Sequence, residues 1–185
     1  DLADKLGHPV FEIPVQPPSV PGMRLNALLT RMASAKARVI LGSPLKALHA
    51  AHGRVQAVEY ASAGRATRVE TRAVILAAGG FESGALELDS YGVVRDTVCA
   101  LPVMGPTGQL LHADFWGEEQ PLFLAGLAVD DSMRVVDENG KAVYTNLFAA
   151  GGNLAGATRW REKSGEGIAL ASALAAVDAI VEELK

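Results

Sequence analysis

The sequence predicts an α/β fold that carries an antiparallel β-meander and an inserted α+β cap. Two short apolar runs, residues 74–81 (VILAAGGF) and 146–153 (NLFAAGGN), each stop at a pair of glycines. Residues 45–78 alternate polar and apolar side chains around turn glycines, a pattern typical of antiparallel strands. The C-terminal stretch after SGEG is rich in alanine, which favours a long helix.

Composition limits the classes of protein to which the chain can belong. The chain has 185 residues, of which 49% are hydrophobic, enough for a core in one compact unit or two small lobes. The formal net charge is -4 with mixed signs, so the sequence lacks the basic stripe that nucleic acid requires. Cys99 is the only cysteine, which excludes a disulfide framework or a thiolate metal cluster. Apolar stretches fall short of the roughly 20 residues of a membrane span.

The first forty residues combine a proline-rich segment with a helical pattern. The chain begins at Asp1 without a methionine or a signal peptide, so we expect a fragment of a longer protein. Four prolines in residues 11–22 predict an extended or looped segment. Residues 23–37 place apolar side chains at helical spacing, and residues 38–42 (RVILG) predict a short buried strand.

The remaining elements follow from periodicity and turn residues. Residues 45–78 predict a three-stranded antiparallel meander that leads into a buried parallel strand ending at Gly80. Residues 133–144 predict a hairpin, because an Asn-Gly pair at 139–140 favours a tight turn. NLFAAGG predicts another short buried strand, and the final helix is expected from near Gly165 to about Glu183.

The glycine strand ends and the start of the final helix are the first places to expect chemistry. Glycine lets a ligand or another backbone come close, and ligands bind outside the carboxyl ends of strands in open α/β sheets. Gly165 and Gly167 lie at a helix N-terminus, which attracts anions. Two purely structural alternatives stay open. In the first, the glycine pairs only form two tight turns that pack on each other. In the second, the alanine-rich helix only packs in a core.

The loop TRWREK supplies cations just before that helix. Arg159, Arg161 and Lys163 suit a clamp for a phosphate-bearing substrate, since arginine binds phosphate through two parallel hydrogen bonds. The alternative is a solvated loop that Glu162 and Glu166 neutralise locally. Among the histidines, His112 is the better candidate for a general base.

The order of these segments resembles the C-terminal part of two-dinucleotide-fold flavoproteins. That order is PPSVPGMRL, a helix, RVILGSPL, the meander, VILAAGGFESGAL, a cap, a hairpin, NLFAAGG and SGEGIALASALAA. More narrowly, it resembles a family of anaerobic glycerol-3-phosphate dehydrogenase subunits, in the fumarate reductase and succinate dehydrogenase flavoprotein group. The resemblance covers nearly the whole chain and is strongest over residues 17–25, 74–86 and 146–175.

The resemblance implies a partial FAD-binding Rossmann-like domain, with FAD as the cofactor and FMN as the alternative. Residues 1–80 and 144–185 would form the flavin-binding domain, and residues 81–143 the substrate cap. In such flavoproteins the first strand end lies near the diphosphate and adenosine half, the second near the ribityl chain, and the last helix N-terminus near the flavin carbonyls. The implied cofactor-binding residues are Ala77, Ala78, Gly79, Gly80, Gly151, Gly152, Gly165, Glu166, Gly167 and Ile168.

The family implies oxidation of glycerol 3-phosphate to dihydroxyacetone phosphate, with hydride transfer to flavin and electron transfer through partner subunits to a membrane quinone. We therefore expect a small phosphorylated substrate, other dehydrogenase subunits as partners, no nucleic acid, no metal, and membrane contact only through those subunits. The location would be cytoplasmic or peripheral on the inner membrane face. Another oxidoreductase of the group, or a non-catalytic subunit that assembles or relays electrons, stays open.

Two departures from the family pattern concern the cofactor. Many relatives have an acidic residue after AAG that holds a ribityl hydroxyl, whereas this chain has Gly152, so Asn153 or Glu166 would have to replace it. The G-x-G-x-x-G segment is absent from the sequence. We therefore expect this chain alone to bind FAD weakly and to be inactive.

Overall fold

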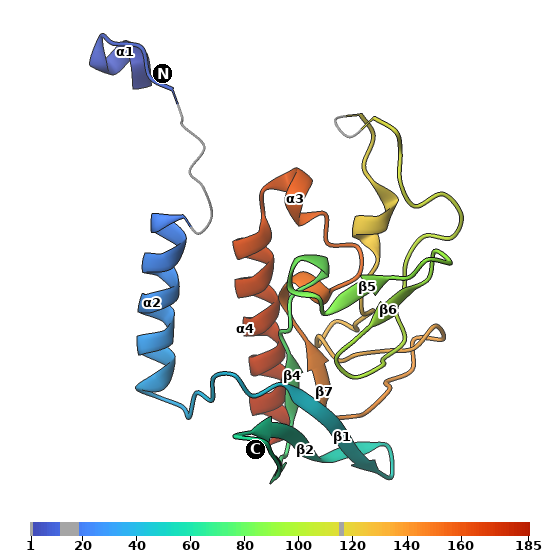
Figure 1. Ribbon diagram of the computed structural model, residues 1–185. Helices are drawn as coiled ribbons and strands as arrows, with labels where there is room; N and C mark the ends of the chain where they lie inside the picture. Colours follow the sequence, from blue (N-terminus) through green and yellow to red (C-terminus); the bar gives the residue numbers. More distant parts are fainter. Residues whose placement is uncertain (1, 12–18, 115–116) are drawn as a thin grey trace. The chain divides into compact units, whose positions relative to one another are not determined.

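The computed structural model describes residues 2–11, 19–114 and 117–185, and the chain divides into two compact units (Figure 1). The first unit, Asp1–Gly42, holds α1 (Leu2–Leu6) and α2 (Val20–Ser34). The second unit, Ser43–Lys185, holds the described strands together with α3 and α4. The chain is therefore a mixed α/β protein with antiparallel strands, as predicted.

Helix α2 begins at Val20, whereas Met23 was the predicted start. The Ser19 side chain accepts a hydrogen bond from the Gly22 amide at 3.1 Å and caps the helix. Pro21 lies in the first turn, where a missing N–H is tolerated because that group has no helical partner. The expectation of an extended segment is therefore wrong from residue 20 onward, and residues 12–18 lie outside the described residues.

The buried strand predicted for residues 38–42 is also wrong. This stretch forms a loop and a turn, and Leu41 is 80% exposed. None of the described strands forms a ladder with it. Strand propensity mostly reflects packing against neighbouring strands, so a β-branched run without a neighbour does not become a strand.

The predicted meander is confirmed. Strands β1 (Leu45–Ala51), β2 (Arg54–Ser62) and β3 (Arg65–Glu70) pair antiparallel in that order. The two connecting turns, His52-Gly53 and Ala63-Gly64, have positive φ at both residues, with values of 52° and 71° in the first and 48° and 77° in the second. That geometry matches the right-handed twist of the flanking strands.

The two apolar runs with glycine ends become neighbouring parallel strands, as Figure 1 shows. Strand β4 (Val74–Leu76) pairs with β7 (Leu147–Ala149), and all three residues of β7 are fully buried. Arg134 forms an antiparallel bridge with Phe148 on β7. Because β4 and β7 are parallel, both glycine pairs lie at the same edge of the sheet.

Asn146 joins the meander to this parallel pair. Its side chain is 1% exposed. The Oδ1 atom accepts a hydrogen bond from the Val55 amide at 2.8 Å, while Nδ2 donates to the carbonyls of Val55 and Arg72 at 2.8 and 2.9 Å. Each polar group of the carboxamide is thus matched to backbone of β2 or of the link between β3 and β4.

The region between β4 and β7 is largely irregular. It contains η1 (Phe81–Ser83), the antiparallel hairpin of β5 (Leu86–Leu88) and β6 (Val94–Asp96), and η2 (Pro121–Leu124). The tight turn predicted around residues 138–140 is confirmed, because the Gly140 amide donates to Asp137 O at 2.9 Å. Its arms form isolated bridges, such as that between Val136 and Ala142.

Helix α4 (Gly165–Glu183) has the predicted bounds and follows the one-turn helix α3 (Arg159–Glu162). It packs on η3 (Gly151–Asn153) and β7 through its buried residues, Ser172 and Ala176. Leu170 and Leu174 on the same helix are 75% and 59% exposed. No helix in the described part of the chain is both long and apolar enough to cross a membrane.

Candidate functional site

The two glycine strand ends are in direct contact. A Cβ atom placed on Gly152 would lie 3.4 Å from the carbonyl carbon of Gly79, and one placed on Gly80 would lie 2.6 Å from the carbonyl oxygen of Gly152. The second approach is closer than real Cβ contacts, so residue 80 needs to be glycine. The strand ends therefore form one surface of bare backbone at the carboxyl edge of β4 and β7.

The guanidinium group of Arg159 lies over this bare backbone. The same hypothetical Cβ atoms would lie 2.5 Å from Arg159 Nη2 at Gly80 and 2.8 Å from Nη1 at Gly152. Arg159 Nη2 also donates a hydrogen bond to Glu82 Oε2 at 2.7 Å. The arginine that the sequence suggested as a phosphate clamp thus has an internal carboxylate as its partner.

The charge of Glu82 is stabilised where it lies. Partial burial alone would raise the pKa of Glu82, but hydrogen bonding with its own backbone amide and with Arg159, together with the charge of Arg159, outweighs this effect. The net result is a pKa below the usual value of 4.5. Glu82 is therefore ionised at neutral pH, and the contact with Arg159 is an ion pair.

The other two predicted catalytic residues meet the loop around Gly117. Arg161 Nη1 donates a hydrogen bond to Gly117 O at 3.1 Å. His112 Nε2 lies 3.9 Å from Glu118 Oε2, and the His112 amide donates to the buried side chain of Gln120 at 2.7 Å. The structure therefore brings Arg161 and His112 to one loop, while Arg159 contacts the end of β4.

The N-terminus of α4 lacks a side-chain cap. Ser164 precedes the helix, but its hydroxyl donates to Glu162 Oε2 at 2.9 Å instead of accepting from the helix. A Cβ atom on Gly167 would meet nothing within 4 Å, so the first turn borders open space there. Ile168 packs its side chain against the core. The first backbone N–H groups of α4 are thus available to an acceptor.

Ser172 connects α4 to the second strand end. Its hydroxyl accepts a hydrogen bond from the Gly151 amide at 2.9 Å and donates to Ile168 O at 2.6 Å. Gly151 has φ of 79°, a conformation that glycine adopts without strain. The sequence alone did not point to Ser172 or Glu82, since neither shows its partner through spacing along the chain.

The first strand end borders a surface pocket of about 470 Å³. Ala78 and Ser83 line it, together with Pro44 and Leu45 at the start of β1. The Ser83 hydroxyl donates to Ala78 O at 2.7 Å, which fixes the turn after β4. Ala77 is exposed at the same strand end. A pocket therefore borders the first strand end, and the adenosine half of the cofactor stays a prediction for this place.

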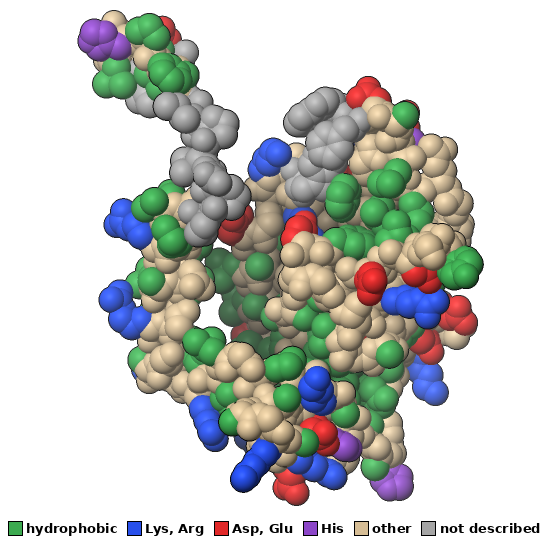
Figure 2. Space-filling model, in the orientation of Figure 1, with side chains coloured by type: hydrophobic (Ala, Val, Ile, Leu, Met, Phe, Trp, Pro, Cys, Tyr) green, Lys and Arg blue, Asp and Glu red, His purple; other side chains and the backbone are tan. Residues whose placement is uncertain are grey.

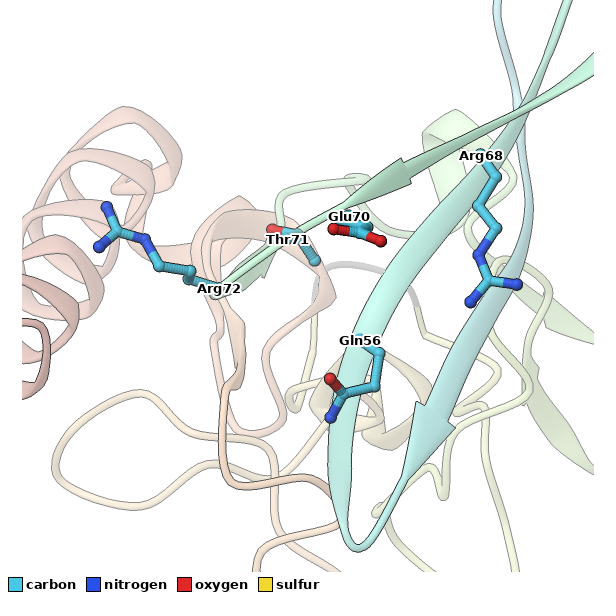
Figure 3. Close-up of a pocket in the computed structure, with 5 residues that line it drawn as sticks. All are labelled: Gln56, Arg68, Glu70, Thr71 and Arg72. Atoms are coloured by element: carbon cyan, nitrogen blue, oxygen red, sulfur yellow. The ribbon is translucent and has the colours of Figure 1, made fainter.

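A second pocket lies at the opposite end of β4 and is polar. Figure 3 shows Gln56, Arg68, Glu70 and Thr71 around it, with the side chain of Arg72 directed away from the others. In Figure 2, Lys and Arg side chains at the lower edge over the meander are interspersed with Asp, Glu and His side chains. Because ligands of α/β sheets bind at the carboxyl ends of strands, this amino-end pocket is not the candidate cofactor site.

Fold and site define an α/β protein whose candidate ligand site is a bare-backbone surface beside a helix N-terminus. The FAD binding domain family matches residues 2–168, and the chain belongs to that family. This membership confirms the FAD prediction. No solved structure was found to match the chain.

The curated relatives that match the chain are named as the same subunit of one enzyme. The chain is 31% identical over 185 residues to a probable anaerobic glycerol-3-phosphate dehydrogenase subunit of Halobacterium salinarum, covering 99% of this chain and 43% of the relative. It is 29% identical over 191 residues to the corresponding subunit of Pectobacterium atrosepticum, with the same coverage. The chain thus spans less than half the length of these relatives, and the resemblance inferred from the sequence is confirmed.

The described residues fit parts of an FAD molecule. The strand ends have no Cβ atoms to block a close approach, and the first turn of α4 offers uncapped N–H groups. Asn153 is 3% exposed, and its Oδ1 atom has no hydrogen-bond partner among the described residues. One feature opposes close approach, because Arg159 already covers Gly80 and Gly152.

Proposed function

We propose that the protein is a flavin-dependent dehydrogenase that oxidises glycerol 3-phosphate to dihydroxyacetone phosphate. The name shared by relatives that align with almost all of this chain carries the proposal. The cationic loop at Arg159 and Arg161, beside the bare backbone of the strand ends, supports it. We further propose that partner subunits take the electrons to a membrane quinone, since the relatives are named as one subunit of a larger enzyme.

In this proposal the chain's own residues bind and orient. Gly79, Gly80, Gly151 and Gly152 would hold the cofactor through exposed backbone, and the free N–H groups at the N-terminus of α4 would donate hydrogen bonds to it. Bound FAD supplies the hydride acceptor. Arg161 holds the substrate phosphate, and His112 accepts the proton of the substrate hydroxyl. The Rossmann-like domain and the cap over residues 81–143 belong to the same proposal.

The test is anaerobic reduction of the flavin. The intact protein, loaded with FAD and with its partner subunits present, should lose its visible flavin absorbance on addition of glycerol 3-phosphate, whereas glycerol and succinate should leave it unchanged. Reduction by succinate instead would favour another oxidoreductase of the group.

Arg161→Ala tests the phosphate contact. A charged hydrogen bond is worth roughly 1.5–3 kcal/mol, so KM for glycerol 3-phosphate should rise about tenfold to a hundredfold. Arg161→Lys should recover part of the loss, because lysine keeps the charge without the planar fork. An unchanged KM would show that Arg161 is a solvated loop residue.

A second function, that of a non-catalytic flavin-binding subunit, has one observation in its favour. Arg159, one of the two arginines suited to a substrate phosphate, is paired with Glu82. Stoichiometric FAD that glycerol 3-phosphate fails to reduce, even with partner subunits present, would support this second function.

A further inference from the structure

The Arg159–Glu82 pair occupies the place where an anionic ligand would reach the strand ends. The guanidinium lies over Gly80 and Gly152, and Glu82 is on the turn directly after β4. A phosphate group that approaches the bare backbone from this side meets Arg159 first. The same cation therefore has two possible partners, an internal carboxylate and an external phosphate.

We propose that Glu82 is an internal competitor that keeps Arg159 over the strand ends until a phosphate group of the ligand displaces the carboxylate. The proposal rests on the proposed function, since it takes the ligand to be FAD or a phosphorylated substrate. It assigns Glu82 a role in setting affinity, through Arg159, without contact between Glu82 and the ligand.

The exposure of the two partners makes this exchange feasible. The side chain of Glu82 is 64% exposed, whereas that of Arg159 is 24% exposed. Pairs of this kind, open to solvent on the carboxylate side, are worth little in water. A phosphate monoester, or the diphosphate of FAD as a whole, carries about two negative charges against one for the carboxylate. It can also accept two parallel hydrogen bonds where Glu82 accepts one from Arg159, so it is the stronger partner.

The glycines determine which backbone becomes accessible when a phosphate replaces Glu82 as the partner of Arg159. Side chains at positions 80 and 152 would collide with the guanidinium, so the absence of Cβ atoms is what lets Arg159 lie against the strand ends. When Arg159 turns toward a phosphate, the same backbone becomes accessible. The glycine pairs thus allow both arrangements, the one with Arg159 over the strand ends and the one with a ligand against them.

The experiment compares Glu82→Gln with Glu87→Gln in the flavin-free protein. Both variants lose one negative charge, but Glu87 is an exposed residue of β5, and the carboxylate paired with Arg159 is that of Glu82. The probes are FAD and riboflavin, read by flavin fluorescence, and glycerol 3-phosphate and glycerol, read by calorimetry. Comparing each phosphorylated probe with its unphosphorylated partner separates an effect on phosphate binding from an effect on binding in general. Comparing the flavin pair with the glycerol pair shows whether the phosphate that displaces Glu82 belongs to the cofactor or to the substrate.

Glu82→Gln should tighten binding of the phosphorylated probe by about two- to fivefold, in line with the small worth of an exposed ion pair. Glu87→Gln should leave the affinity for the phosphorylated probe unchanged. In an Arg159→Ala background, Glu82→Gln should bring no gain in affinity, because the Glu82 carboxylate acts only through that arginine. Equal affinities for Glu82→Gln and Glu87→Gln, or a gain that persists without Arg159, would overturn the proposal.

A flavin-independent measurement keeps this result separate from the proposed function. Phenylglyoxal labels accessible guanidinium groups, and inorganic pyrophosphate should protect Arg159 at a lower concentration in Glu82→Gln than in the unchanged protein. If FAD fails to bind but this difference is present, the competition between Glu82 and phosphate stands independently of flavin binding. If pyrophosphate protects both proteins equally, the competition is wrong.

Discussion

The side chain of Asn146 forms hydrogen bonds with three backbone groups. Its carboxamide bonds to the amide and carbonyl of Val55 and to the carbonyl of Arg72, all at 2.8–2.9 Å. Buried backbone groups without a partner are costly, because water is not there to replace the lost bond. The fold therefore depends on the amide chemistry at this position as well as on its shape.

Replacing Asn146 tests this dependence. Asn146→Ala should lower the free energy of unfolding by about 2–4 kcal/mol, since it leaves the buried amide and carbonyl of Val55 unpaired. Asn146→Asp keeps the size and the acceptor but removes the donor, so it should cost at least as much at neutral pH. Urea denaturation measures both, and an aspartate variant as stable as the parent would contradict the assignment of Nδ2 as a donor.

Cys99 is protected from reaction by its surroundings. Burial raises the pKa of the Cys99 thiol to about 12, with a further contribution from the charge of Asp96. At pH 8 the native thiol should react with a disulfide reagent at least about a hundredfold more slowly than in urea, because the thiolate is the nucleophile.

The same shift has a consequence for stability. A thiol whose folded pKa lies above its unfolded pKa stays protonated in the native state while the unfolded state ionises, so stability should fall from about pH 9 upward. Cys99→Ser should remove this part of the alkaline loss. Fast labelling of the native protein at pH 8 would contradict both expectations.

Arg134 ties the end of α4 to the middle of the sheet. Its guanidinium pairs with Glu183 at the end of the helix, donates to Asp130 and to Thr145 O, and lies 5.4 Å from the centre of the Phe148 ring. Phe148 is fully buried in β7. One side chain thus joins the helix, the turn before residue 134 and the core strand.

Arg134→Met should lower the free energy of unfolding by roughly 1–2 kcal/mol, because it keeps the apolar stem but loses the hydrogen bonds and the cation–π contact. Arg95→Met is the matched control. Arg95 pairs with Asp89 on an exposed hairpin, so its loss should cost less than about 0.5 kcal/mol. Equal midpoints in urea for the two variants would show that the Arg134 contacts contribute nothing.

How far the sequence predicts these elements depends on whether the signal is local. The meander turns, the Asn-Gly turn and the bounds of α4 were predictable, because glycine and periodicity mark them within a few residues. The loop at residues 38–42 was not predictable, because an apolar run of this kind becomes a strand only where another strand is available to pair with it. In the candidate site the glycines stand out in the sequence, but Glu82, 77 positions from Arg159, carries no such mark.

The two units of the chain differ in how they bury apolar surface. Every buried hydrophobic residue that the structure describes falls between Val55 and Ala176, inside Ser43–Lys185. Helix α2 has no buried residue, and its Leu29 and Met32 are 53% and 59% exposed. The predicted flavin-binding domain of residues 1–80 and 144–185 cuts across this division and stays a prediction.

A chain of residues 43–185 should therefore fold without residues 1–42. Its urea transition should keep the midpoint and slope of the whole chain, because the slope follows the surface exposed from the core. As a control, a chain that ends at residue 163 lacks α4 and should lose the cooperative transition. A clear drop in midpoint after removal of residues 1–42 would show that the first unit contributes to the stability of the second.

The carboxamide bridge of Asn146 has a consequence for hydrogen exchange. Strand β2 cannot leave β7 without breaking the bonds of Val55 to Asn146, so the meander and the parallel pair should open together as one cooperative unit. The amide of Val55 should then be as protected from deuterium as that of Ala150, which bonds to Leu76 O across the parallel pair. Faster exchange at Val55 than at Ala150 would reveal a meander that opens by itself.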